Sequence, residues 1–261
     1  MSWSLKARIL GRSLLLQACW SYERMQGLGF CYAMQPWLQK CYGERQAELR
    51  SAQLRQLEFF NTQPYMAPLA LGMVSALEEE ASGLPAAERD ERIARMGRLK
   101  GSVAASLAGI GDALFWGALR PFCAALSLAL TLLAWRLDFL LALLGLPGLY
   151  LAAYSLPAFF VRCRGLGWGY SWGDQIAARL AAFPWQVWIR RLRLAGFLLA
   201  LAVCGLMLAS PLVDSRQRWV GAIMLLGYFL VLFLLAARAS PYRLYLATCL
   251  LGSLAAAGGW I

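Results

Sequence analysis

The stretch Leu99–Phe122, LKGSVAASLAGIGDALFWGALRPF, decides the fold class because it sets two charged side chains within apolar sequence typical of membrane proteins. Asp112 and Arg120 lie there among Ala, Leu, Ile, Phe and Trp residues. A formal charge at bilayer depth costs about 2.5–3.5 kcal/mol, so such groups persist where they pair, line a cavity or meet a ligand. The stretch Glu58–Glu80, EFFNTQPYMAPLALGMVSALEEE, has the same character. Together the two stretches predict a polar site inside a membrane protein.

The composition of the whole chain supports this class. Of 261 residues, 60% are hydrophobic and 15% are charged, whereas a soluble domain has about 45–50% apolar and about 25% charged residues. The net charge of +11 comes almost wholly from arginine, since lysine occurs only at Lys6, Lys40 and Lys100. Basic loops are expected on the cytoplasmic side of a membrane protein. We therefore favour this origin of the charge over nucleic-acid binding.

Several chemistries are excluded or disfavoured by residue type. The chain has no histidine, which excludes a phosphohistidine carrier, a histidine acid–base site and a histidine-ligated metal. Its seven cysteines are scattered without a CxxC pair, so neither a zinc site nor a disulfide framework is expected. The glycine pairs near Gly109 and Gly167 lack the spacing of a nucleotide-binding motif and favour close helix packing or a backbone bend. We expect no metal, no cofactor and no catalytic residue.

The predicted fold is an all-α integral membrane protein with about five full transmembrane helices, shorter re-entrant or broken helices, and N-terminal amphipathic helices. Two apolar segments, Met66–Leu77 and Ser102–Gly111, are too short for the roughly 20 residues of a span, which favours re-entrant or buried helices. The expected full spans are Ala113–Trp135, Leu137–Val161, Leu194–Ser210, Trp219–Ala237 and Leu244–Ile261. The expected divisions are 1–57 (amphipathic, cytoplasmic), 58–112 (core with the charged linker 81–100), 113–161 (transmembrane hairpin), 162–193 (cytoplasmic, amphipathic) and 194–261 (C-terminal bundle).

Local patterns add detail to this fold. Apolar residues between Leu14 and Phe30 recur at helical spacing, and Pro36 is expected to end or kink the first long helix. Pro147 and Pro157 are expected to kink or interrupt the second span. The basic loops predict a cytoplasmic N-terminus and an external C-terminus.

Four residues form the predicted polar centre: Asn61, Gln63, Asp112 and Arg120. Amides donate to and accept from sugar-like hydroxyls, and Asn61 and Gln63 precede Pro64 at an expected helix break; helix capping by Asn61 or Thr62 is the alternative. A straight helix separates Asp112 from Arg120 by about 12 Å, so each is expected to find another partner. Asp112 is also placed to cap the following span.

The acidic run Glu78-Glu79-Glu80 has two interpretations. It is either a solvated helix end, or one carboxylate folds back to pair with an arginine in the polar core. Consecutive helical residues point in different directions, so two of these carboxylates will not share a substrate. We expect Glu79 and Glu80 to support the polar centre.

Four ordered motifs resemble the IID subunit of the mannose/fructose/sorbose family of the bacterial phosphotransferase system. They are Leu16–Phe30 (LQACWSYERMQGLGF), Glu58–Met66 (EFFNTQPYM), Ala76–Glu80 (ALEEE) and Leu107–Arg120 (LAGIGDALFWGALR). The resemblance departs in two places: the family commonly has histidine where Gln63 stands, and the connection Ser210–Arg218 is much shorter than usual.

The resemblance implies a multi-pass subunit of the bacterial inner membrane that pairs with a IIC subunit to translocate a hexose. It also implies that the chain carries no phosphorylation site of its own. It implies that cytoplasmic IIA and IIB carry the phosphoryl group, and that IIC–IID pairs assemble into a hetero-oligomer, expected to be a trimer. The basic residues Arg190, Arg191 and Arg193 are expected to attract IIB. The alternative is a membrane scaffold or regulatory subunit that has lost transport, which Gln63 and the short connection motivate.

Overall fold

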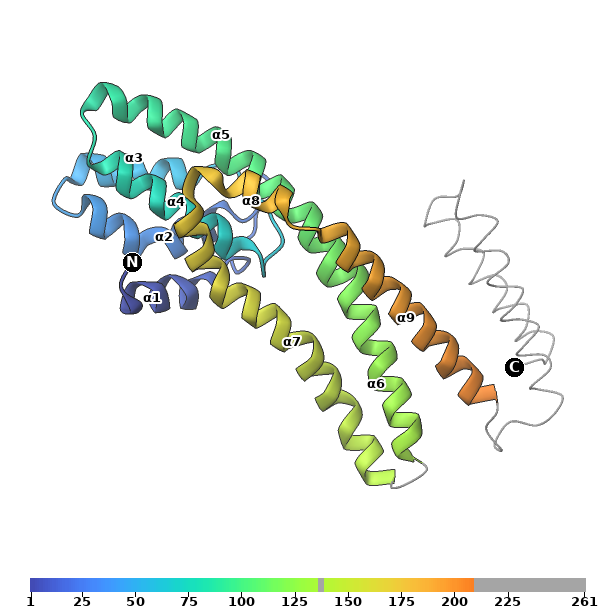
Figure 1. Ribbon diagram of the computed structural model, residues 1–261. Coiled ribbons are helices and arrows are strands. Elements are labelled where there is room, and N and C mark those ends of the chain that lie inside the picture. The colour runs from blue at the N-terminus through green and yellow to red at the C-terminus, as the bar shows by residue number, and fades with distance from the viewer. Residues whose placement is uncertain (136–138, 209–261) are drawn as a thin grey trace.

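The computed structural model describes residues 1–135 and 139–208, which form helices joined by turns (Figure 1). In chain order the elements are α1 (Trp3–Ser13), α2 (Gly27–Tyr42), α3 (Gln46–Gln56), α4 (Ala67–Ser82), α5 (Ala86–Gly111), the π-helix η1 (Asp112–Leu119), α6 (Arg120–Trp135), α7 (Phe139–Trp172), the 3-10 turn η2 (Gly173–Gln175), α8 (Ile176–Ala182) and α9 (Trp185–Leu208). The predicted all-α class is confirmed for this part of the chain.

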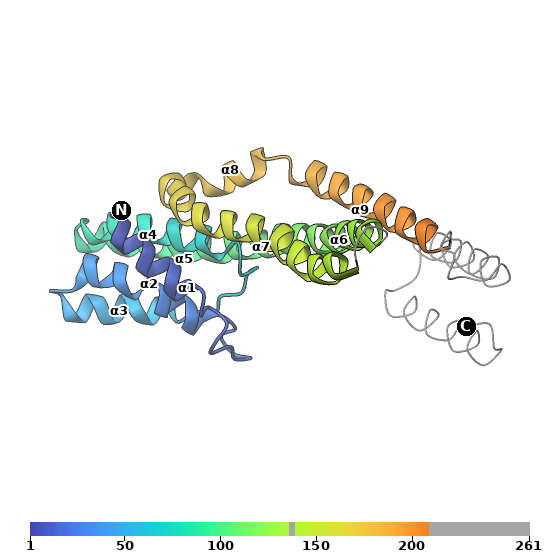
Figure 2. The same cartoon turned by 90° about the horizontal axis from the view of Figure 1, so that it is seen from below.

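The helices divide into a packed body and a long projecting layer. Helices α1–α4, the first part of α5 and the C-terminal part of α7 form the body, whereas α6, α9 and the N-terminal part of α7 project away from it (Figures 1 and 2). Helix α6 lies between α7 and α9 and packs against both. The layer exposes large apolar side chains, among them Leu130, Leu133, Leu156, Phe160 and Leu198. Such a surface suits lipid or another apolar subunit.

Helix α4 is the centre of the body. It is buried along most of its length and packs against α2, α5 and α7. Its contact with α7 is a contact between backbones: a Cβ atom at Gly72 would lie 2.1 Å from the Leu166 carbonyl oxygen, and one at Gly169 would lie 2.0 Å from that of Leu69. Small residues allow such close approach of membrane helices. The close-packing interpretation is therefore confirmed at Gly169, whereas Gly167 has no atom this near.

The helical pattern between Leu14 and Phe30 gave a wrong expectation. Helix α1 ends at Ser13 and α2 begins at Gly27, with turns between them. Met25 has a φ of 50° and forms isolated bridges with Ser21 and Phe60. A non-glycine residue in this left-handed region is uncommon and must be held by its surroundings.

Pro36 does not end its helix, because α2 continues to Tyr42. Proline lacks the N–H that would bond to the carbonyl four residues earlier. That carbonyl belongs to Tyr32, and the Arg12 Nη1 atom donates to its oxygen at 3.2 Å. A side chain from the preceding helix thus replaces the missing hydrogen bond.

Two further expectations change. The charged segment 81–100 is mostly helical, since α5 begins at Ala86, and Ser102–Gly111 is the end of this helix and not a separate short segment. The many charged side chains of residues 86–99 made the segment resemble a linker, although it belongs to the same helix as residues 102–111. Helix α7 likewise continues past Pro147 and Pro157 to Trp172.

The helical stretch Ala86–Ala134 is the one helix, among the described residues, that is long and apolar enough to cross a membrane. It unites the segments predicted as Ser102–Gly111 and Ala113–Trp135. The expected spans Trp219–Ala237 and Leu244–Ile261 lie outside the described residues. The division into five segments remains a prediction.

Candidate functional site

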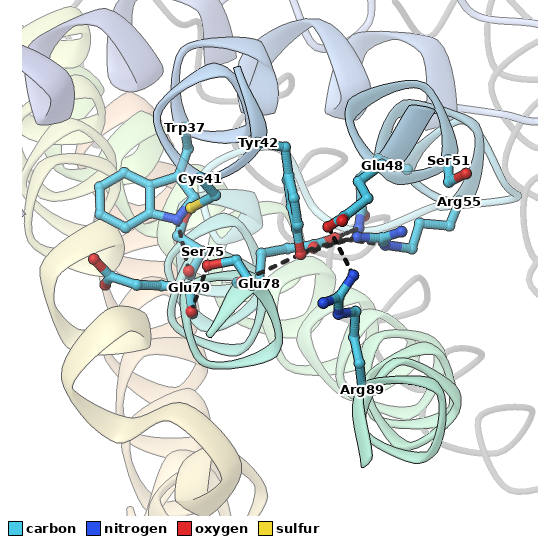
Figure 3. Close-up of polar contacts among 12 residues, drawn as sticks. Trp37, Cys41, Tyr42, Glu48, Ser51, Arg55, Ser75, Glu78, Glu79 and Arg89 are labelled. Atoms are coloured by element: carbon cyan, nitrogen blue, oxygen red, sulfur yellow. Dashed lines mark hydrogen bonds and ion pairs between the residues drawn. The ribbon is translucent and has the colours of Figure 1, made fainter. Parts of the chain in front are cut away.

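A buried carboxylate, that of Glu78, organises one end of the body (Figure 3). The Glu78 side chain is 0% exposed. Arg55 from α3 approaches it with two nitrogens, Nε at 2.8 Å from Oε1 and Nη2 at 2.5 Å from Oε2. Paired, charge-assisted contacts of this kind are among the strongest polar interactions in proteins. The carboxylate thus ties α3 to α4.

Three more polar side chains complete this cluster. The Tyr42 hydroxyl donates to Glu78 Oε2 at 2.8 Å, and Gln56 Nε2 donates to Oε1 at 2.7 Å. Lys100 of α5 donates to Gln56 Oε1 at 2.9 Å, and its ammonium lies 4.5 Å from the Phe30 ring centre. Burial and then the Glu78 carboxylate raise the pKa of Tyr42, which keeps its hydroxyl protonated as a donor. The cluster joins α2, α3, α4 and α5.

Glu79 and Glu80 point away from this cluster into separate ion pairs. Glu79 accepts from Lys40 at 2.7 Å and from the Tyr170 hydroxyl. Burial raises the pKa of Glu79, but the hydrogen bonds from Lys40 and Tyr170 outweigh it, so the pKa lies below its ordinary value. Glu80 is exposed and pairs with Arg92. The pairing with arginine that the sequence left open belongs, in the buried core, to Glu78.

The loop before α4 is fastened to the turn before α2. The Gln26 side chain donates to the Thr62 carbonyl at 2.8 Å and accepts from the Thr62 amide at 3.0 Å. The Thr62 hydroxyl donates to the Ala104 carbonyl at 3.0 Å, which links the loop to α5. Arg162 of α7 donates to the Pro64 carbonyl at 3.0 Å. These bonds hold non-helical backbone in one conformation between four elements.

Gln63 occupies the centre of this loop. It is 1% exposed, and its Oε1 atom accepts from the backbone N–H groups of Tyr65 at 2.7 Å and Met66 at 3.2 Å. Its Nε2 atom has no hydrogen-bond partner among the described residues. Gly111 lies directly beside it, since a Cβ atom there would be 2.5 Å from Gln63 Cβ. Gln63 therefore holds the turn before α4 with one end of its amide and leaves the other end unpaired within the described residues.

The remaining predicted residues lie near this loop or farther along η1 and α6. Asn61 is exposed two residues before Gln63, and Asp112 is exposed next to Gly111. Arg120 begins α6 and is also exposed. Within the described residues neither Asp112 nor Arg120 forms a hydrogen bond or ion pair, although the Arg120 charge acts on Tyr154 of α7. That each charge finds a partner stays a prediction.

The three arginines predicted to bind a partner lie in the first turns of α9. All three are exposed. Arg193 Nε donates to the Gly117 carbonyl of η1 at 3.2 Å. Arg190 and Arg191 make no ion pair within the described residues. Arg193 thus supports the π-helix, whereas the other two guanidinium groups face outward.

The predicted polar centre is consequently divided between the two ends of α4. Asn61, Gln63 and Asp112 gather at its N-terminal end, and Glu79 and Glu80 lie at its C-terminal end. A 16-residue helix is about 24 Å long, so the two groups do not form one site. Within residues 1–135 and 139–208, no three acidic or cysteine side chains are grouped as a metal site would need. The N-terminal end, with its unpaired amide, is the candidate functional site.

Comparisons with known proteins agree with the motifs. The family model described as the PTS system mannose/fructose/sorbose family IID component matches residues 4–215. The mannose-specific EIID component of Escherichia coli K12 is 35% identical over 211 residues, which cover 78% of this chain and 69% of that protein. The fructose permease IID component of Bacillus subtilis 168 is 31% identical over 213 residues, covering 78% and 70%.

Two solved structures are also similar. One is a chain in the cryo-EM structure of the mannose transporter ManYZ with microcin E492, with 28% identity and a TM-score of 0.57. The other is described as a membrane protein, also with 28% identity, and has a TM-score of 0.67. Each match covers 99% of this chain and 97% of the matched chain.

Proposed function

The chain belongs to the IID components of the mannose/fructose/sorbose family of the phosphotransferase system, and we propose that it forms a sugar translocation unit with a IIC subunit. In this proposal the IIA and IIB subunits supply the phosphoryl group and perform the chemistry, and the present chain holds and orients the sugar or the IIC surface that carries it. The assembly is a trimer of IIC–IID pairs in the bacterial inner membrane, with several spans from each chain.

The observation that supports a polar function for this chain is the unpaired Nε2 atom of Gln63. A buried donor without a partner costs about 1–3 kcal/mol of stability. A residue used only for packing would not need such a donor. A sugar hydroxyl or a carbonyl of the IIC subunit satisfies this donor. Asn61 and Asp112, at the same end of α4, add an amide and a carboxylate that bind hydroxyl groups.

The geometry also explains how the loop presents Gln63. The reciprocal Gln26–Thr62 bonds and the Arg162–Pro64 bond fix the backbone on both sides of it. Gln63 Oε1 already accepts from two backbone N–H groups, so the side chain cannot rotate without losing these two hydrogen bonds. A donor held in this way requires no reorganisation when a hydroxyl arrives, which favours selective binding.

The Gln63→Glu variant tests the proposal because glutamate keeps the two accepting bonds to Tyr65 and Met66 and removes the Nε2 donor. Sugar uptake driven by phosphoenolpyruvate is measured in cells that contain IIA, IIB, IIC and this chain. We expect uptake to fall by about tenfold or more, the equivalent of one hydrogen bond of about 1.4 kcal/mol. Gln63→His restores a donor and is expected to retain uptake.

Gln53→Leu is the control, since Gln53 also uses its Nε2 atom but in an ordinary bond to Gln35 at 3.0 Å. Co-purification with IIC must be equal for every variant compared. Full uptake by Gln63→Glu would contradict a role for this donor. If removing the whole chain leaves uptake through IIC unchanged, the chain is instead a scaffold without a part in transport.

A further inference from the structure

A groove is lined by residues of α5 and of the α8–α9 connection. Figure 1 shows that this connection passes close to α5. Its volume is about 390 Å³. Both walls present mainly apolar side chains, including Val103 and Ile110 from α5 and Leu180, Phe183, Trp185 and Val187 from the other wall. Phe183 and Val187 are about half exposed. An apolar ligand can therefore reach the groove from outside the protein, past Phe183 and Val187.

The shape of this connection is fixed by local contacts. Phe183 and Trp185 flank Pro184, and their ring centres lie 4.3 Å apart. Trp185 Nε1 donates to the Leu180 carbonyl at 2.9 Å, which ties the start of α9 back to α8. The apolar wall therefore exists before any ligand arrives, as expected for a binding groove.

Positive charge borders the groove on the α9 side. Residues four apart lie on the same face of a helix. Arg190 follows Gln186 by four residues and Arg191 follows Val187 by four, and both Gln186 and Val187 line the groove. Residues 175–208 contain four arginines and neither aspartate nor glutamate. No carboxylate of the described residues pairs with Arg190 or Arg191.

Trp188 adds a third feature of an interfacial site. It is 48% exposed, and the Arg191 guanidinium lies 5.8 Å from its ring centre. Tryptophan is enriched at the level of lipid headgroups. Basic pockets between membrane helices on the cytoplasmic side bind anionic headgroups. An apolar groove next to unpaired arginines and an interfacial tryptophan fits an amphiphile with an anionic head.

We propose that this groove holds an acyl chain of an anionic phospholipid, with the phosphate of its headgroup against Arg190 and Arg191. The lipid would fill the space between α5 and the α8–α9 connection and thereby join the projecting layer to the body. This role replaces, for these two arginines, the attraction of IIB that the sequence predicted. It does not depend on which sugar is carried.

Photolabelling tests the proposal with the full chain co-purified with its IIC subunit and reconstituted in nanodiscs. The probes are phosphatidylglycerol and phosphatidylcholine that have the same diazirine-bearing acyl chain. We expect labelling of peptides containing residues 102–110 and 183–187, with phosphatidylglycerol favoured about fivefold or more, because one arginine near an anionic headgroup contributes a factor of this size. In the double variant Arg190→Gln/Arg191→Gln the preference should disappear.

Two further variants make the result specific. Ser106→Trp fills the groove from an exposed position on α5 and should abolish labelling by both lipids at these peptides. Arg8→Gln/Arg50→Gln removes the same charge from exposed arginines elsewhere and should keep the preference. Equal labelling by the two lipids, a preference that survives the Arg190/Arg191 change, or no labelling because IIC covers the groove would each overturn the proposal.

Discussion

Replacing Glu78 by glutamine tests whether the buried carboxylate holds the body together. The substitution keeps the size of the side chain and removes its charge. Glu78 accepts from Arg55, Tyr42 and Gln56 at both of its oxygens. Whichever way the new amide is turned, its NH₂ group faces a nitrogen of the Arg55 guanidinium, so a donor meets a donor. Arg55 is left without its counter-charge at a site where its side chain is only 15% exposed.

Breaking a buried ion pair by removing one partner costs about 3–5 kcal/mol. For a domain of 150–250 residues, 1 kcal/mol corresponds to about 2–4 °C in melting temperature. We therefore expect Glu78→Gln to lower the melting temperature by about 6–20 °C. Glu80→Gln is the matched control two residues along the same helix, because it loses an exposed pair with Arg92. Exposed pairs are worth about 0.2–1 kcal/mol, so its melting temperature should fall by less than about 4 °C.

The assay is thermal unfolding of the full chain with its IIC subunit in detergent, followed by fluorescence-detected size exclusion. Adding Arg55→Met to Glu78→Gln should lower the melting temperature little further, since the two residues act as one pair. The reasoning is refuted if Glu78→Gln and Glu80→Gln melt within about 2 °C of each other.

Three further results are expected. Gly169→Ala sets a Cβ atom 2.0 Å from a backbone carbonyl and should destabilise the fold by about 1–3 kcal/mol in thermal unfolding, whereas Gly167→Ala, with open space around it, should be neutral or mildly stabilising. Burial and then the Glu79 carboxylate raise the pKa of Cys41 to about 11, so iodoacetamide at pH 8 should modify the exposed Cys19 much faster than Cys41. The Glu79→Gln variant should speed the reaction at Cys41. Equal rates at the two cysteines would contradict this expectation. Because the folded pKa of Glu79 lies below its ordinary value of 4.5, its ion pair stabilises the fold above that pH, and the melting difference between wild type and Glu79→Gln should shrink as the pH falls below it.

The sequence predicted the helical class, the short buried helix α4 and the close packing at Gly169, because apolar composition and small residues act locally. It did not show which carboxylate of the run 78–80 is buried with an arginine. Consecutive helical residues are about 100° apart, and no local rule says which one faces inward. The register gives no signal either, because residues 71–77 are all buried and each of the three carboxylates follows buried residues by four and by seven positions.

Other features depend on contacts between distant segments. Pro36 can lie inside α2 because Arg12 donates a hydrogen bond to the Tyr32 carbonyl. These two residues are 20 apart in sequence. The contact between Gln63 and Gly111 depends on how α5 passes the loop, which the local sequence of neither segment determines. Met25 has a left-handed backbone conformation although methionine is not a typical turn residue. Backbone bridges to Ser21 and Phe60 hold this conformation, so the local sequence does not predict it.

The π-helix η1 has a consequence for how motion passes along the chain. A π-helix bonds each N–H to the carbonyl five residues back, whereas an α-helix uses four, so its eight residues are wound more loosely than their neighbours. Tightening this coil by a single residue would turn α6 by about 100° and slide it by about 1.5 Å relative to α5. Arg120 would then swing to another side of the helix, and Arg193 would lose its carbonyl acceptor on Gly117. A change in the winding of η1 would therefore rotate the layer relative to the body, and the bond from Arg193 to the Gly117 carbonyl stabilises the present winding.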